Sequence, residues 1–177
     1  QTMLDELGYL TPKRTAQLLG QHVQTRSSKV LDVGSGTGLA GMELSQLSFM
    51  SIDGLDYSPE MLEVAKSRDI YDSLIKADLN LPLGIESVTY DALICTGTFT
   101  HAHVGAGCLP KLFRILKPGG IFACTIHKQV WEPAGFAAQV EAMHASGFIQ
   151  TLHHEEGKYY SNSDDPEGWY IVWQKAA

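Results

Sequence analysis

A glycine-rich turn constrains the fold of this chain more than any other feature. An apolar, strand-like run at 29–33 leads directly into Gly-Ser-Gly-Thr-Gly at positions 34–38, and a helical pattern follows from about Leu39. Glycines let backbone N–H groups and a helix N-terminus approach a ligand closely, because no side chain blocks the approach. A strand, a glycine turn and a helix in this order predict an α/β domain that binds a ligand at the turn.

Helical and strand-like segments alternate along the rest of the chain, as in a mostly parallel sheet covered by helices. The patterns predict strands at 29–33, 49–55, 74–77, 92–95, 121–126, 148–153 and 169–174, and helices at 11–22, 39–47, 58–67, 109–116 and 135–146. Segment 81–86 is typical of a loop or a short helix. We therefore predict a Rossmann-like three-layer α/β sandwich. Its seven-stranded sheet is mostly parallel, and its last strand is antiparallel.

A length of 177 residues suits one such domain, and no repeat or low-complexity segment marks a boundary. The domain is expected to contain an N-terminal helix at 11–22, a ligand-binding core at about 29–126 and a C-terminal part at 127–177. The chain opens on Gln1, so an N-terminal extension is expected, and its first residues lack a signal-peptide pattern.

Composition limits the partners that this chain can have. A net charge of -7, without any run of lysine or arginine, argues against a protein that binds nucleic acid by neutralising phosphates. No apolar stretch approaches the roughly 20 residues of a membrane span. Cys95, Cys108 and Cys124 lack CxxC spacing and lie in apolar surroundings, which indicates reduced core thiols. We therefore expect a cytoplasmic protein, and a nuclear location is equally compatible with these features.

Two classes of nucleoside ligand suit the glycine turn. A G-x-G-x-x-G pattern, which is the dinucleotide signature, can be drawn through positions 36–41. That signature should begin where the strand ends, at Gly34, and its third glycine position then holds Leu39. The carboxylate of Asp32 at the strand end repels a pyrophosphate and attracts an ammonium group. S-adenosylmethionine carries an α-amino group and a sulfonium but no phosphate, so the turn favours it over NAD(P).

A second carboxylate supports nucleoside binding. Asp56 ends the second predicted strand about 20 residues after the turn, where a carboxylate can accept both ribose hydroxyls. This contact serves NAD and S-adenosylmethionine equally, so it does not choose between them.

Five sequence blocks in the order of one family cover about residues 29–126. They are Leu31-Asp32-Val33-Gly34-Ser35-Gly36-Thr37-Gly38, Gly54-Leu55-Asp56-Tyr57-Ser58-Pro59-Glu60-Met61-Leu62, Ala77-Asp78-Leu79, Tyr90-Asp91-Ala92-Leu93-Ile94-Cys95 and Leu116-Lys117-Pro118-Gly119-Gly120. These blocks resemble class I S-adenosylmethionine-dependent methyltransferases. Within that superfamily, Gly8-Tyr9-Leu10-Thr11-Pro12 looks similar to the methyltransferase-like proteins of the Williams–Beuren syndrome chromosomal region. The resemblance implies an enzyme that uses S-adenosyl-L-methionine and releases S-adenosyl-L-homocysteine.

The resemblance also implies roles for individual residues. Asp56 would hold the ribose, Tyr57 and Met61 would flank the adenine, and Asp78 would accept from its exocyclic amine while the Leu79 N–H meets the ring edge. Core packing is an equal alternative for Met61. The expected cofactor-binding residues are Asp32, Gly34, Ser35, Gly36, Gly38, Asp56, Tyr57, Met61, Asp78, Leu79, Cys95 and Thr96. The last two are expected to contribute backbone at the methionine end, because they leave the fourth strand at its carboxyl end.

No catalytic residue is assigned from the sequence. His101 and His103 follow the fourth strand and face the expected acceptor pocket, where a histidine suits the role of base. Loop capping without chemistry is the favoured alternative for both histidines. The Cys95 thiol is expected to be inert, and no histidine has the spacing of a metal ligand. Three aromatic residues could line an acceptor pocket, but ordinary packing is the favoured role for each of them: Tyr9, Trp131 and Tyr160.

The sequence does not identify the methyl acceptor. Enzymes that methylate amino groups of nucleic acids and glutamine often carry Asn/Asp-Pro-Pro-Tyr/Phe after the fourth strand, where this chain has Cys-Thr-Gly-Thr at 95–98. A small-molecule or protein acceptor is therefore expected, contacted by the acceptor-side part 127–177 and its polar loop 161–168. An NAD(P)-binding oxidoreductase and a non-catalytic S-adenosylmethionine-binding module remain as alternatives. An aminopropyl transferase is a more distant one, because its acidic motifs are missing.

Overall fold

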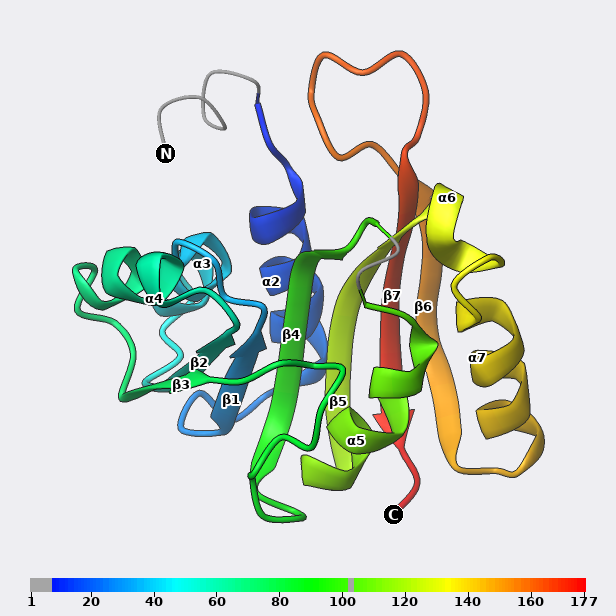
Figure 1. Cartoon of the computed structure of the whole chain (residues 1–177), viewed down its shortest axis with the longest axis horizontal. Helices are drawn as coiled ribbons and strands as arrows, with labels where there is room; N and C mark the ends of the chain where they lie inside the picture. Colours follow the sequence, from blue (N-terminus) through cyan, green and yellow to red (C-terminus); the bar gives the residue numbers. More distant parts are fainter. Residues whose placement is uncertain (1–7, 102–103) are drawn as a thin grey trace.

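A seven-stranded sheet runs through the structure, a computed structural model that describes residues 8–101 and 104–177 (Figure 1). The strands are β1 (Lys29–Val33), β2 (Ser51–Asp56), β3 (Ser73–Lys76), β4 (Tyr90–Phe99), β5 (Leu116–His127), β6 (Ile149–Gly157) and β7 (Gly168–Lys175), in the spatial order β3-β2-β1-β4-β5-β7-β6. Neighbouring strands from β3 to β5 are parallel, whereas β7 pairs antiparallel with both β5 and β6. The predicted mostly parallel sheet with an antiparallel last strand is confirmed.

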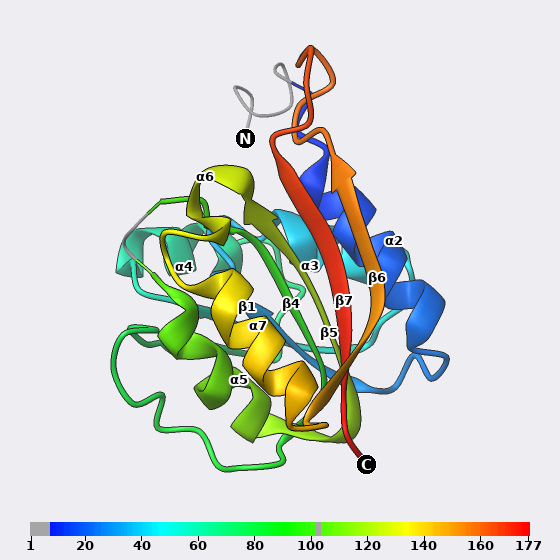
Figure 2. The same cartoon turned by 90° about the vertical axis from the view of Figure 1, so that its right-hand side faces the viewer.

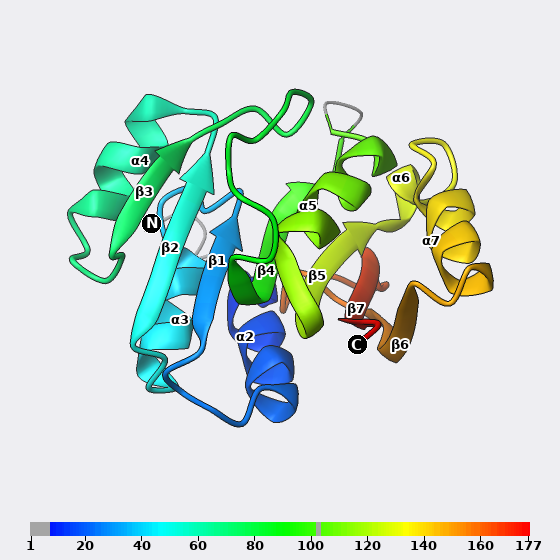
Figure 3. The ribbon, with the colours of Figure 1, turned by 90° about the horizontal axis from the view of Figure 1, so that it is seen from below.

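Helices cover both faces of this sheet (Figure 3). They are α2 (Thr11–His22), α3 (Leu39–Gln46), α4 (Pro59–Lys66), α5 (Leu109–Ile115), α6 (Lys128–Trp131) and α7 (Phe136–Ala145), with a 3-10 turn, η1, at Ala106–Cys108. Successive side chains of a strand point to opposite faces. Val30 accordingly belongs to the core cluster that includes side chains of α2 and α3, while Leu31 belongs to the cluster on the opposite face that includes side chains of α5 and α7. In the described part of the chain, no helix is both long and apolar enough to cross a membrane.

Part of one face of the sheet is covered by a segment without regular secondary structure. The sequence allowed a loop or a short helix here, and the structure shows the loop. Residues 77–89 run from β3 to β4 without any helix, and their side chains Leu79 and Leu83 are buried in the core. Two cations of α5 hold the segment: Lys111 Nζ donates to the carbonyls of residues 79 and 81, and Arg114 Nη2 donates to the Ile85 carbonyl at 2.8 Å. These side-chain hydrogen bonds replace the internal hydrogen bonds that a helix would have supplied.

Most element bounds lie within a few residues of the prediction, and the larger differences occur where strands extend. The Pro-Gly-Gly turn was expected to precede the fifth strand, yet β5 begins at Leu116 and includes this turn as an irregularity in its pairing with β4. The short helix α6, capped by the His127 side chain, was not predicted, because four residues give too little periodicity.

An outward bulge near the end of β4 shapes the ligand edge of the sheet. Cys95 pairs with Cys124 and Phe99 with Ile126, so four steps along β4 match only two along β5. Residues 96–98 of β4 therefore lie opposite the single residue Thr125 of β5, and Gly97 takes a φ of 72° within them. Bulges of this kind redirect side chains next to functional sites.

Candidate cofactor site

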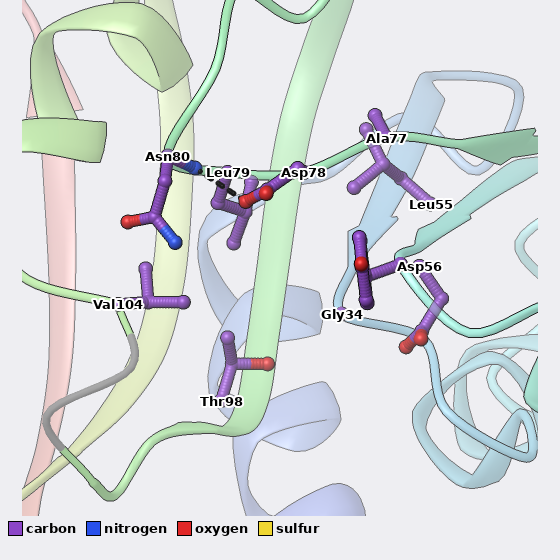
Figure 4. A pocket seen from close by; sticks show the side chains of 10 residues that line it. Gly34, Leu55, Asp56, Ala77, Asp78, Leu79, Asn80, Thr98 and Val104 are labelled. Atoms are coloured by element: carbon purple, nitrogen blue, oxygen red, sulfur yellow. Dashed lines mark hydrogen bonds between the residues drawn. The ribbon is translucent and has the colours of Figure 1, made fainter.

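Two cavities meet at the carboxyl ends of β1, β2 and β4, around Gly34, Asp56 and Thr98. The first has a volume of about 380 Å³ and is lined by Gly34, Leu55, Asp56, Tyr57, Ala77, Asp78, Leu79, Asn80, Thr98 and Val104 (Figure 4). The second, of about 410 Å³, is lined by Tyr9, Pro12, Gly34, Ser35, Gly36, Thr37, Leu39, Ala40, Asp56, Ser58, Met61, Thr96, Gly97 and Thr98. Their three shared residues make them two ends of one elongated site.

The glycine turn has the backbone that its composition predicts. Gly34, Gly36 and Gly38 take φ values of 65°, 52° and 91°, in the region that side chains disfavour. A Cβ at Gly34 would overlap the hydroxyl of Thr98, whereas a Cβ at Gly36 would meet nothing within 4 Å. The turn therefore presses against the β4 bulge at one glycine and borders open space at the next.

Asp56 ties the turn to the end of β2. Its Oδ2 accepts from the Gly36 N–H at 2.8 Å, and its Oδ1 accepts from the Ser58 N–H at 2.9 Å. Each carboxylate oxygen keeps a further lone pair for a ligand hydroxyl. The hydroxyl of Ser35, buried in the same wall, has no hydrogen-bond partner among the described residues. A ligand with polar groups suits this wall, because it can satisfy an otherwise unpaired buried group.

Asp32 differs from its expected role. It lines neither cavity, is only 1% exposed and accepts a hydrogen bond from the Tyr71 hydroxyl at 2.6 Å. The cause is strand alternation, which points Asp32 to the same face as Val30, toward α3. Asp32 therefore supports the turn from beneath and does not border either cavity.

The third glycine of the apparent dinucleotide signature is explained by the same contact. A Cβ at Gly41 would overlap the Tyr71 hydroxyl, and a Cβ at Gly54 would lie 3.1 Å from the Tyr71 ring. These glycines form a slot through which Tyr71 reaches Asp32. Gly38 lines neither cavity, and a Cβ at this position would lie 3.2 Å from the Tyr71 ring. The slot, and not a pyrophosphate, accounts for the glycine at position 41.

The buried carboxylate of Asp32 should give the stability of the fold a characteristic pH dependence. Burial raises the pKa of Asp32 from 3.8 to about 6, partly offset by hydrogen bonds from Tyr71 and from the Gly41 backbone. The folded state then binds the proton more tightly, so the free energy of unfolding falls as pH rises from about 4 to 6 and levels off above. We expect Asp32→Asn to remove this fall, as measured by urea unfolding at pH 4, 5, 6 and 7.5. Parallel pH profiles of the two proteins would contradict the assignment.

Of the four residues expected around the adenine, three line the first cavity and one, Met61, lines the second. Asp78 and Leu79 line the first cavity, and Asn80, which sequence reasoning missed, donates its N–H to the Asp78 Oδ1 at 2.8 Å. Tyr57 is 68% exposed at the rim of that cavity. Met61 is 44% exposed and lines the second cavity, so it is not a core residue.

The end of β4 contributes through its bulge. Thr96 lines the second cavity, as expected, but Cys95 is fully buried and lines neither. Burial raises the pKa of the Cys95 thiol well above its usual value, which fits the expected inert role. Thr98 was missed, since a bulge within a strand has no signature in a single sequence. It lines both cavities and packs on Gly34.

His101 and His127 lie at the same edge of the sheet, where His101 follows β4 and His127 ends β5. His101 is exposed, with its Nδ1 3.4 Å from Gln129 Nε2, and His103 lies outside the described residues. His127 was not singled out as a base; its Nδ1 accepts the Gln129 N–H at 3.1 Å, and burial lowers its pKa. Residues 8–101 and 104–177 contain no cluster of side chains suited to hold a metal ion.

The charges of the site select between the two candidate ligands. Asp56 and Asp78 are the charged side chains among the lining residues of the two cavities, and both are acidic. A dinucleotide would place its pyrophosphate among carboxylates without a cationic partner in this set. A ligand with a sulfonium and an ammonium group meets favourable charge there instead. The residues present therefore fit S-adenosylmethionine.

Comparisons with known proteins agree with this selection. Residues 31–124 match the family model described as a methyltransferase domain. The chain is 33% identical to methyltransferase-like protein 27 of Homo sapiens over 120 residues, which are 66% of this chain and 49% of that protein. It is 34% identical to a sterol 24-C-methyltransferase of Clavispora lusitaniae over 53% of this chain and 26% of that protein. The chain thus spans about half of the first relative's length and about a quarter of the second's.

The fold is shared with solved structures of the same kind. An S-adenosylmethionine-dependent methyltransferase from Mesorhizobium loti superposes with a TM-score of 0.69 at 16% identity, covering 90% of this chain and 96% of the other. At such low identity the likeness concerns the fold alone. It confirms the predicted three-layer architecture.

Proposed function

Because this chain belongs to the methyltransferase domain family of class I S-adenosylmethionine-dependent enzymes, we propose that it transfers a methyl group to a small-molecule or protein acceptor. The observation that carries the proposal is the elongated site. It is lined by the glycine turn, by the Asp56 carboxylate, which can accept the ribose hydroxyls, and by charged side chains that are all acidic. Family membership also decides against the NAD(P)-binding oxidoreductase. The product of the proposed reaction is S-adenosyl-L-homocysteine.

In this proposal the two cavities hold different parts of the cofactor. Asp56 binds the ribose hydroxyls at the junction, where Gly36 and Ser58 already orient its carboxylate. The first cavity takes the adenine, with Asp78 and Leu79 at its inner wall. The second takes the amino-acid part along backbone and side-chain groups of Gly34, Ser35, Gly36 and Thr96. Tyr57 borders the first cavity, and Met61, which was expected beside the adenine, borders the second.

When bound, S-adenosylmethionine supplies an electrophilic methyl group. The residues of the chain contribute mainly by holding the acceptor and the cofactor in line, which by itself accounts for a large part of the acceleration in such reactions. A base is needed only where the acceptor atom has a high pKa. His101 remains the candidate, because it is exposed and follows β4 at the edge of the sheet where the site lies.

The properties of the whole protein follow as part of the same proposal. We propose one domain across residues 1–177, supported by the single sheet that extends from Lys29 to Lys175. A small-molecule acceptor is supported by the relative named as a sterol methyltransferase, and the net charge of -7 argues against nucleic acid. The three buried free thiols support the cytoplasm or nucleus.

Two measurements test the proposed function. Isothermal titration with S-adenosylhomocysteine and, separately, with NADH should show binding of the first alone. Incubation of the protein with methyl-labelled S-adenosylmethionine and fractionated cell extract should then transfer label to an acceptor. Binding without any transfer would favour the non-catalytic module, and absence of S-adenosylhomocysteine binding by folded protein would refute the assignment of the site.

A further inference from the structure

The N-terminal segment and the turn between β6 and β7 lie side by side and form a clasp (Figure 2). Tyr9 of this segment lines the second cavity. We define the clasp as residues 8–10 and 159–161. The Leu10 N–H donates to the Tyr159 carbonyl at 2.8 Å, and the Ser161 N–H donates to the Gly8 carbonyl at 3.0 Å. Tyr9 and Tyr160 form an antiparallel bridge between these two hydrogen bonds. Two segments far apart in the sequence are thereby joined by a minimal piece of sheet.

The clasp carries the Tyr9 ring to the wall of the second cavity. On one side the ring stacks on Tyr160, with centroids 5.2 Å apart and planes inclined by 33°. On the other side its hydroxyl reaches the β4 bulge, because a Cβ at Gly97 would lie 2.7 Å from that oxygen. Tyr9 thus spans from the clasp to the bulge, across the end of the cavity that Thr96 and the glycine turn also line.

The partner turn is itself held firmly. The Glu167 carboxylate accepts the Tyr159 N–H at 2.6 Å and the Ser163 hydroxyl, and the Tyr170 hydroxyl donates to the Lys158 carbonyl at 2.7 Å. Burial raises the pKa of Tyr9, so its phenol stays neutral at physiological pH. A neutral aromatic ring on a fixed support is suited to exclude water from one side of a ligand.

We propose that Tyr9 is a positioning residue that closes the cavity over the amino-acid end of the cofactor, and that the clasp holds it there. This inference rests on the proposed function, because it assumes that the second cavity takes that end. The Tyr9 ring closes the cavity, because it fills the space between Tyr160 and Gly97. Loss of the ring therefore opens a direct exit for the ligand and acts mainly on the dissociation rate.

The test uses S-adenosylhomocysteine as the probe and follows its release from the whole chain by stopped-flow displacement. Tyr9→Ala is expected to release the probe about tenfold faster, a difference of about 1.4 kcal/mol. Tyr9→Phe should restore the rate to within about twofold of the unmodified chain. Phe148→Ala is a matched control, because it removes another partly exposed aromatic ring, one that lies against Phe113 and lines neither cavity. Its release rate should stay unchanged.

A second variant tests the role of the clasp. Tyr160→Ala removes the ring that supports Tyr9, so release should be faster than in the unmodified chain but slower than in Tyr9→Ala. The double variant should release the probe no faster than Tyr9→Ala, because both changes remove the same closure. Additive effects of the two substitutions would overturn the link between clasp and closure.

A measurement on the unmodified chain keeps the inference testable if the variants do not fold. Saturating S-adenosylhomocysteine should slow hydrogen exchange at the Leu10 and Ser161 amides, whose hydrogen bonds form the clasp. Unchanged exchange there, or an unchanged release rate in folded Tyr9→Ala, would overturn the inference while the proposed function stands. Failure of the unmodified chain to bind the probe would instead refute the proposed function.

Discussion

Asp56→Asn is expected to weaken the binding of S-adenosylhomocysteine about 100-fold. Hydrogen bonds to a charged group contribute roughly 1.5–3 kcal/mol each, and the ribose offers two hydroxyls to this carboxylate. Asparagine keeps one acceptor oxygen, so about 3 kcal/mol of the binding energy should be lost, which corresponds to this change in Kd. The carboxylate also orients the turn through the Gly36 N–H, so the same substitution loosens the second cavity.

Titration calorimetry with the purified variant measures this loss. Asp72→Asn is the matched control, because it removes an exposed carboxylate of the same kind that hydrogen-bonds Ser51 and lines neither cofactor cavity. Its affinity should stay within about twofold of that of the unmodified chain. An Asp56→Asn variant that binds S-adenosylhomocysteine as tightly as the unmodified chain would contradict the assignment of Asp56 to the ribose.

Tyr71→Phe should lower the free energy of unfolding by about 3 kcal/mol at neutral pH. The substitution deletes only the hydroxyl that donates to Asp32 at 2.6 Å. The Asp32 carboxylate, which is 1% exposed, then lacks that hydrogen-bond donor. A buried acceptor without its partner costs about 1–3 kcal/mol, and a charged one costs more.

Urea unfolding at pH 7.5 provides the measurement. Tyr57→Phe is the control, because this tyrosine is 68% exposed and its hydroxyl can be replaced by solvent, so the change should stay within about 0.5 kcal/mol. In the double variant with Asp32→Asn the loss should be smaller, since a neutral amide tolerates burial better than a carboxylate. A Tyr71→Phe variant as stable as the unmodified chain would contradict the pairing.

The sequence predicted the architecture because the strongest signals were local. The run at 29–33 and the turn at 34–38 have distinct periodicity and glycine content, and Ser58 and Pro59 start α4 as expected, with the Ser58 hydroxyl accepting the Met61 N–H. These patterns depend on neighbours along the chain. They identify elements and the edge of the sheet at which a ligand binds.

The sequence could not predict contacts that depend on packing between distant segments. Nothing adjacent to Asp32 shows that Tyr71 occupies the space beneath the turn, so its carboxylate was expected to face the ligand. The bulge at 96–98 depends on the pairing of β4 with β5, and Thr98 was missed for that reason. Tyr9 was expected to serve packing, because its proximity to Gly97 follows only from the folded chain.

The segment at 77–89 makes the end of the site that it borders easier to open than the end at the glycine turn. Residues 78–87 belong to no strand or helix, and side chains of Lys111 and Arg114 fasten their carbonyls to α5. Such a segment can detach while every strand stays paired, whereas the floor beneath the glycine turn is part of the sheet. In the proposed placement of the cofactor, the adenine end can therefore open by local detachment of this segment, and the hydrogen bonds from Lys111 and Arg114 oppose that detachment.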